Sequence, residues 1–239
     1  MSEQATGSER LAVRVSSPPA DFGAVRTNFF VRRWDADATR WAAMRLADMH
    51  RPRKDPKAIT GAEFDFLKVA PYSETLDEDC NLIVQNGWIA LLGGVAGTTM
   101  APKFSATNAR IGVGTSVTAA AYTQTTLVGD TGAASTTSYF KLCSGAPTIA
   151  TGSTPPTLTF SAAFGTAVAN FAWQEFGSDA GTADSVSNAT TGGTFFNRGV
   201  SSQGTKASGQ TWTATETISF GYPSGSGRSP WCPGWTRPG

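Results

Sequence analysis

The single histidine limits the catalytic chemistry that this chain can perform. His50 stands beside Arg51 and Pro52, where the sequence predicts the end of a helix. Any Ser-His-Asp or Cys-His arrangement would have to include this residue. The C-terminal end of a helix stabilises a protonated imidazole, so a structural role explains His50 without catalysis. We therefore interpret it as a structural residue.

Carboxylate pairs are the second kind of residue that could do chemistry, because glycosidases need two and calcium sites need several oxygen ligands. Acids are few between residues 98 and 220: Asp130, Glu175, Asp179, Asp184 and Glu216. Glu175 follows a predicted strand, and Asp179 and Asp184 lie in the loop after it. We interpret these three as parts of a solvated loop, with a glycosidase pair or a calcium site as the alternatives.

The cysteines and glycines offer no cofactor site. Cys80, Cys143 and Cys232 are far apart and include no CxxC pair, which argues against both a disulfide framework and a zinc site. We expect buried thiols in a protein made in a reducing cytosol. Gly112 and Gly114 match half of a dinucleotide-binding fingerprint, without its third glycine or its helix. The sequence therefore predicts a protein that is not an enzyme and has no cofactor.

Charge is concentrated near the N-terminus. Of the 37 charged residues, 25 lie in residues 1–80, and the net charge is +1. This balance favours neither a nucleic-acid partner nor a membrane partner. The basic run at 51–57 is interpreted as a solvated linker or a salt-bridged docking surface. The most apolar run, 81–97, is too short and too interrupted to cross a bilayer, and the polar N-terminus predicts no secretory signal.

The first 97 residues are predicted to form two regions. Residues 1–33 read as an extended arm, because Pro18 and Pro19 disfavour a helix. Residues 34–97 read as a helical, charged docking region. Its helices are expected at 34–49, with Asp35 or Asp37 as the cap, at 60–68 after a capping box, and at 79–92. The last of these is largely apolar and is expected to be buried, ending at Gly93-Gly94.

From about residue 104 the apolar residues alternate with a period of two. Strands are predicted at 109–113, 136–142, 158–164, 171–174, 194–200 and 211–220, with loops at 145–156 and 177–193. Short alternating runs separated by turn residues are typical of an antiparallel sandwich or barrel. The predicted fold is mainly β: an antiparallel, jelly-roll-like β-sandwich over 98–220, preceded by the short helical and extended N-terminal regions and followed by a Gly/Pro/Trp-rich tail at 221–239.

The tryptophans divide into core and interaction candidates. Trp88, Trp173 and Trp212 lie in apolar or alternating runs and are expected in the core. Two more stand in the breaker-rich tail, where indoles are unusual unless they pack on another chain or stack on carbohydrate. Together with the charged N-terminal region, they give a set of predicted interaction residues: Trp34, Trp41, Arg51, Arg53, Trp231 and Trp235.

A series of strand and turn motifs resembles a module of tailed-bacteriophage structural proteins. The motifs are NARIGVGTS, LTFSAAF, ANFAWQEFG, FFNRGV and QGTKASGQTWTATETISF, and the resemblance covers roughly residues 80–220. The most distinctive matching positions are Asn197, Arg198, Gly204, Thr205, Lys206 and Trp212. The charged N-terminal region and the C-terminal tail lie outside the module.

The resemblance implies a structural component of the virion, assembled in the host bacterial cytoplasm, with no catalytic residue. It favours a minor tail or tail-associated protein that self-associates and docks on the major capsid or tail proteins. The alternatives are a capsid decoration protein, of the cement or head-fibre type, and a module that binds a receptor or carbohydrate on the host surface.

Overall fold

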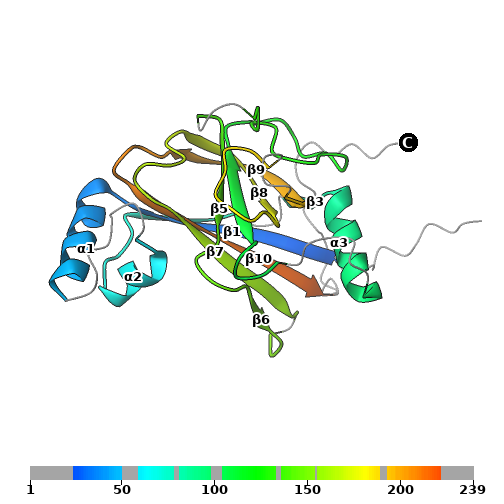
Figure 1. The fold of residues 1–239 in the computed structure, drawn as a ribbon, viewed down its shortest axis with the longest axis horizontal. Helices are drawn as coiled ribbons and strands as arrows, with labels where there is room; N and C mark the ends of the chain where they lie inside the picture. The colour runs from blue at the N-terminus through cyan, green and yellow to red at the C-terminus, as the bar shows by residue number, and fades with distance from the viewer. Residues whose placement is uncertain are drawn as a thin grey trace, which may run out of the picture.

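Two five-stranded antiparallel sheets pack face to face in the computed structural model (Figure 1). The structure describes residues 24–49, 59–77, 81–97, 104–132, 136–153, 155–188 and 193–221. The first sheet has the order β2 (Ser73–Asp77), β1 (Ala24–Trp34), β10 (Thr211–Gly221), β7 (Thr157–Phe164) and β6 (Thr148–Ala150). The second has the order β3 (Asn81–Ile83), β9 (Phe195–Thr205), β8 (Ala172–Asp179), β4 (Arg110–Gly114) and β5 (Ser138–Leu142).

Within the described ranges, three helices flank the sandwich. Helices α1 (Ala36–Asp48) and α2 (Gly61–Phe66) lie at one end of it, and α3 (Gln85–Ala96) lies at the other (Figure 1). The mainly β fold and the antiparallel sandwich predicted from the sequence are confirmed. The strand order does not by itself establish the jelly-roll-like part of that prediction.

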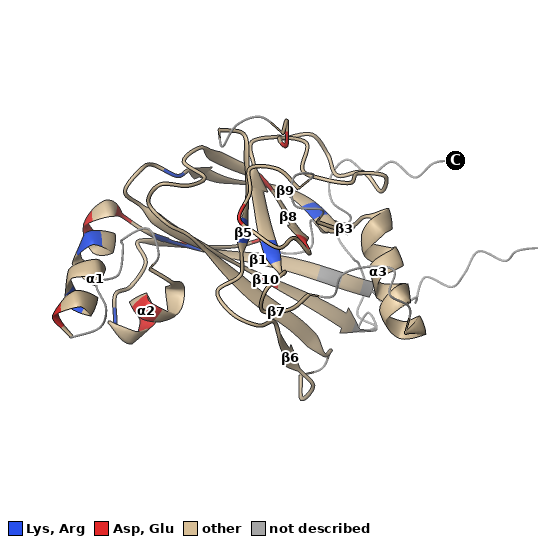
Figure 2. Ribbon diagram, in the orientation of Figure 1, with Lys and Arg blue, Asp and Glu red and all other residues tan. Residues whose placement is uncertain are grey.

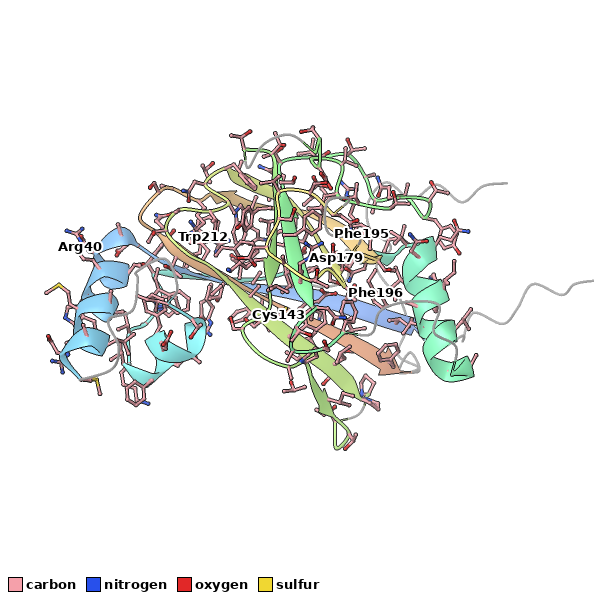
Figure 3. All side chains as sticks on the ribbon, in the orientation of Figure 1. Arg40, Cys143, Asp179, Phe195, Phe196 and Trp212 are labelled. Carbon is pink, nitrogen blue, oxygen red and sulfur yellow. The ribbon has the colours of Figure 1, made fainter. Side chains whose placement is uncertain are left out.

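The period-two pattern produces the core because alternate side chains of a strand point to one face. In β7 and β10 the inward side chains are Phe160, Ala162 and Phe164, and Trp212, Ala214 and Ile218. They meet Ile111, Val113, Trp173 and Phe176 from the second sheet. Figure 3 shows Trp212 within this layer, toward the end that faces α1 and α2.

Aromatic rings dominate the contacts between the sheets. Trp173 lies 5.0 Å from Trp212 and 4.8 Å from Phe164, measured between ring centroids, and both contacts are edge-to-face. Phe29 of β1 lies 5.1 Å from Phe176 of β8. Such pairs add to the stability that area burial alone provides. Core positions for Trp173 and Trp212 are thus confirmed.

Residues 24–33 belong to the sandwich rather than to an arm, which corrects the sequence prediction. Strand β1 pairs with β10 from Ala24↔Gly221 to Trp34↔Thr211 and with β2 on its other side. Phe29 and Val31 point into the core and are fully buried. The extended conformation was expected, but its long-range partner, almost 200 residues away, has no local signal.

Helices α1 and α2 begin where the sequence predicts. The Asp35 side chain accepts a hydrogen bond from the Ala38 N–H at 2.8 Å, and the Thr60 N–H donates to Glu63 at 2.8 Å. The two helices enclose a small apolar cluster of their own, which contains Trp34, Ala42, Ala43, Ile59 and Phe64. It forms a second core at the end of β1.

Helix α3 starts later than predicted. Glu74 and Asp77, which precede the predicted helix, lie in β2, where Glu74 stands opposite Arg32 of β1, a favourable cross-strand pair. Residues 81–83 form β3, and the helix then runs through Gly93 and Gly94 to end at Gly97, which has a left-handed φ of 67°. A glycine in this conformation is a common helix end.

The outer face of the second sheet is covered as well. Gly112 and Gly177 provide room there for the rings of Phe140 and Phe195. These two rings, with Val84 and Leu127, form a third apolar cluster. Both faces of β4 and β8 are therefore buried, and all five residues of β4 are inaccessible to solvent.

We predict that Gly177→Ala destabilises the fold. An added Cβ would lie 2.5 Å from the Asn197 carbonyl oxygen and 2.6 Å from the Phe195 ring, so the strand must shift. Overpacking of this kind costs about 1–3 kcal/mol, measurable as a lower free energy of unfolding in urea. Gly145→Ala is the control, because nothing lies within 4 Å of its added Cβ. Equal stability of the two variants would contradict the close packing described here.

Candidate interaction surface

Two of the three acids considered for catalysis are engaged in buried ion pairs. Glu175 and Asp179 are fully buried, so their interpretation as a solvated loop is wrong. The Arg198 Nε donates to Glu175 Oε2 at 2.7 Å, and the Arg110 Nε donates to Asp179 Oδ1 at 2.6 Å. Both acids lie on β8, and their side chains point away from the core between the sheets. Only Asp184 is partly exposed, paired with Lys141.

These pairs hold two long connections against the outer face of the second sheet. Glu175 accepts hydrogen bonds from the backbone N–H groups of Val128 at 3.0 Å and Gly129 at 2.6 Å. Asp179 accepts from the Asn188 side chain at 2.8 Å, and Arg110 donates to the Ala183 carbonyl at 2.7 Å. Burial raises the pKa of Asp179, and Arg110 opposes that shift. The carboxylates thus organise the β4–β5 and β8–β9 loops.

Two further ionisable groups are buried inside the sandwich. Glu216 of β10 accepts a hydrogen bond from the Asn197 side chain, and burial raises its pKa to about 8. Lys206 donates to the Gly165 carbonyl at 2.8 Å and to Asn170 at 2.7 Å, and burial lowers its pKa to about 7. Each group links strands or turns of opposite sheets, which is a structural role.

The distinctive positions of the phage-like motifs are therefore fold determinants. Asn197 connects the two sheets through Ser178 and Glu216, Arg198 pairs with Glu175, and Lys206 closes the end of the sandwich. Gly204 has a φ of 87°, a conformation that side chains rarely adopt. At these positions the motifs encode buried polar contacts and a turn.

No metal site is found in the part of the chain that the structure describes: it contains no cluster of three or more His, Cys, Asp or Glu side chains. Cys143 is a free, buried thiol whose pKa burial raises, so its reactive thiolate form is disfavoured. His50, Cys80 and Cys232 lie outside the described residues. The expectation that the chain is not an enzyme stays a prediction.

The predicted interaction residues have different environments. Trp34 is fully buried, stacked on Phe64 at 4.3 Å, with its Nε1–H donating to the Val69 carbonyl; it belongs to the helical core, so its assignment to a contact surface is wrong. Trp41 is 47% exposed on α1 and is available for contact. The remaining four predicted residues lie outside the described residues: Arg51, Arg53, Trp231 and Trp235.

Helix α3 carries an exposed apolar surface, although its residues were expected to be buried. Four large apolar side chains of this helix are exposed: Trp88, Ile89, Leu92 and Val95. The exposed fraction is 66% for Leu92 and 90% for Val95. We call these four residues the α3 face. Positions 88, 92 and 95 recur at helical spacing, so their side chains line one side. The helical spacing of these apolar residues could be read from the sequence. It does not show whether the apolar side of the helix is covered by the same chain or by another one.

The opposite side of α3 fixes the helix to the second sheet. Gly87 approaches β9 so closely that an added Cβ would lie 2.1 Å from the Phe196 carbonyl oxygen. The Val84 N–H donates to this carbonyl at 3.1 Å, and the Gln85 N–H donates to the Tyr122 carbonyl at 2.8 Å. The α3 face is thus presented by an anchored helix, with the exposed side chain of Tyr122 in the adjacent loop.

Charge distinguishes α3 from the other helices. It contains no Lys, Arg, Asp or Glu, whereas α1 carries both signs and α2 carries two acids (Figure 2). Contiguous apolar surface on a soluble protein marks an interaction site. None of the helices in the described ranges is both long and apolar enough to span a membrane.

Comparison with protein-family models, with curated proteins and with solved structures finds no match to this chain.

Breaking the Glu175–Arg198 pair should be costly. Glu175→Gln leaves the Arg198 guanidinium buried without an opposite charge, so we expect a loss of about 3–5 kcal/mol in the free energy of unfolding. The matched change Asp184→Asn removes a partly exposed pair with Lys141 and should cost less than about 1 kcal/mol. Urea unfolding of both variants measures the difference, and equal losses would show that the buried pair is not a major contributor.

Glu216 should make stability depend on pH. Its folded pKa of about 8 lies above the ordinary value of 4.5, so the folded state binds more protons between these two values. Stability contributed by protonated Glu216 is therefore lost as pH rises from about 4.5 to about 8, by at most about 1.4 kcal/mol per pH unit. Glu216→Gln should remove this component from urea unfolding measured at pH 5, 6, 7 and 8. Parallel pH curves for the two proteins would contradict the assignment.

Proposed function

We propose that this chain is a structural subunit of a tailed-phage particle that associates with further copies of itself through the α3 face. The phage assignment is supported by the strand and turn motifs between residues 80 and 220. The α3 face carries the proposal of self-association, because four large apolar side chains are exposed together on one anchored helix.

A second copy of this chain is the occupant that the α3 face fits best. In a twofold contact the same patch is present on both partners, so a charge near the axis faces its own copy. An uncharged helix avoids this repulsion. Helix α3 also lies at the end of the sandwich, away from α1 and α2, where a partner could approach it (Figure 1).

The α1–α2 end supplies a second, chemically different surface for neighbouring virion proteins. Trp41 and Met44 are exposed on α1, and Arg40 and Asp37 form a surface ion pair beside them. A mixed apolar and charged surface suits docking on a different protein, such as a major capsid or tail protein. With contact surfaces at opposite ends, a subunit can bind its own kind at one end and the particle at the other.

A minor tail or tail-associated position is preferred because the resembling module belongs mostly to such proteins; a capsid decoration position is the alternative.

Binding of host carbohydrate by aromatic loops has no support from residues 177–193, which contain no aromatic residue. An enzyme of the cell-wall hydrolase type would require a cleft with free carboxylates, and Glu175 and Asp179 are buried in ion pairs.

Self-association should depend on the α3 face. In sedimentation velocity, the weight-average sedimentation coefficient of the wild-type chain should rise with concentration, while Leu92→Lys/Val95→Lys should stay monomeric because two charges would be buried at the contact. Ile149→Lys is the control, since Ile149 is equally exposed but lies on edge strand β6. A wild-type chain that stays monomeric, or a double variant that associates as the wild type does, would refute the proposal.

The particle itself tests the phage assignment. Electron-microscopy maps of tailed particles whose genome encodes this chain should show copies of the sandwich, and gold-labelled antibodies should place them on the tail or on the head. Particles lacking the chain, or a purified chain that hydrolyses bacterial cell wall, would overturn it.

A further inference from the structure

A polar pocket opens where β1, β2, β9 and β10 meet. Its volume is about 330 Å³, in the range of small-molecule sites, and its lining includes Arg33, Tyr72, Ser73, Thr75 and Trp212. It lies at the α1–α2 end of the sandwich, near the position of Trp212 in Figure 3. The α3 face is at the other end, so this pocket is separate from the proposed association surface.

Arg33 is a buried cation whose hydrogen-bond partners among the described residues are all neutral. The residue is only 5% exposed to solvent. Nη1 donates to Ser73 Oγ at 3.1 Å and to Thr75 Oγ1 at 2.7 Å, and Nη2 donates to the backbone and side-chain oxygens of Gln203 at 3.0 and 2.6 Å. The buried Nε has no hydrogen-bond partner. Burial lowers the pKa of Arg33, yet a guanidinium stays protonated in proteins.

The two arginines that are fully buried among the described residues show what is missing at Arg33. Arg110 and Arg198 each pair with a buried carboxylate, Asp179 and Glu175. No carboxylate among the described residues lies within ion-pair distance of Arg33, and its remaining stabilising contact is the Trp212 ring, 4.8 Å from Cζ. A buried charge without a counter-charge is costly. An anion in the adjacent pocket would supply the counter-charge.

The hydroxyl groups between Arg33 and the pocket are oriented for an anion. Because Ser73 and Thr75 accept hydrogen bonds from Arg33, their own O–H hydrogens are free to donate elsewhere. Both residues are half-buried and line the pocket. A bound anion can therefore accept two hydroxyl hydrogen bonds with the guanidinium charge directly behind them.

We propose that this pocket binds a small hydroxylated monocarboxylate, such as a hexuronate, with its carboxylate against Ser73, Thr75 and Arg33. One cation matches one negative charge, which favours a carboxylate over a doubly charged phosphate. The exposed ring of Tyr72 offers an apolar surface for the body of the ligand. The polar side chains of Ser202, Gln203 and Thr205 line the rest of the pocket and can bond to hydroxyl groups.

Isothermal titration of the full chain with sodium glucuronate, glucose, acetate and sulfate tests this proposal. Glucuronate should bind, acetate should bind more weakly because it lacks hydroxyl groups, and glucose should not bind because it lacks the charge. Arg33→Met should weaken glucuronate binding at least tenfold. Arg32→Met is the control, because Arg32 carries the same charge on the adjacent residue but pairs with Asp65 outside the pocket.

A second variant protects the test against misfolding. Ser73→Ala/Thr75→Val keeps the Arg33 charge and removes only the two hydroxyl donors, and it should also weaken glucuronate binding at least tenfold while circular dichroism stays unchanged. Glucose binding as tightly as glucuronate, sulfate binding more tightly than either, or glucuronate affinity unchanged in both pocket variants would overturn the proposal.

Discussion

Leaving a charge buried in the second sheet without its opposite charge would be strongly destabilising. Arg110 pairs with Asp179 and Arg198 pairs with Glu175 across neighbouring strands, and the same carboxylates accept hydrogen bonds from the connections that cover them. The β4–β5 and β8–β9 connections are thereby held against the outer face of the sheet. Glycines beneath the Phe140 and Phe195 rings make room for this layer, so the loops and the rings depend on the pairs.

The same constraint shapes the interpretation of function. Of the five acids between residues 98 and 220, Glu175 and Asp179 neutralise arginines, Glu216 lies between the sheets, and Asp130 accepts hydrogen bonds from Thr126 and Ser187. Asp184 pairs with Lys141. These carboxylates hold the fold together. Among the described residues, the surfaces that stand out for function are the uncharged α3 face, the exposed side of α1, and the pocket beside Arg33, where no described carboxylate pairs with the cation.

Local patterns predicted much of the fold, and contacts distant in sequence account for the errors. The alternation through Phe160 and Phe164 and the cap at Asp35 act over a few residues, so strands and helix starts could be predicted. Glu175 looked like a loop acid because its partner Arg198 is 23 residues away; Asp179 and Arg110 are 69 apart. Composition could not separate the exposed α3 face from a core helix, because an apolar helix looks the same whether its own chain or another one covers it.

Self-association through α3 is the central claim, and hydroxyl-radical footprinting across a concentration series tests it most directly. Oxidation of Trp88 and Leu92 should fall as the protein concentration rises, while oxidation of Trp41 and Ile149 should stay constant. Oxidation of Trp88 that is independent of concentration, or protection that appears at Trp41 instead, would contradict the claim.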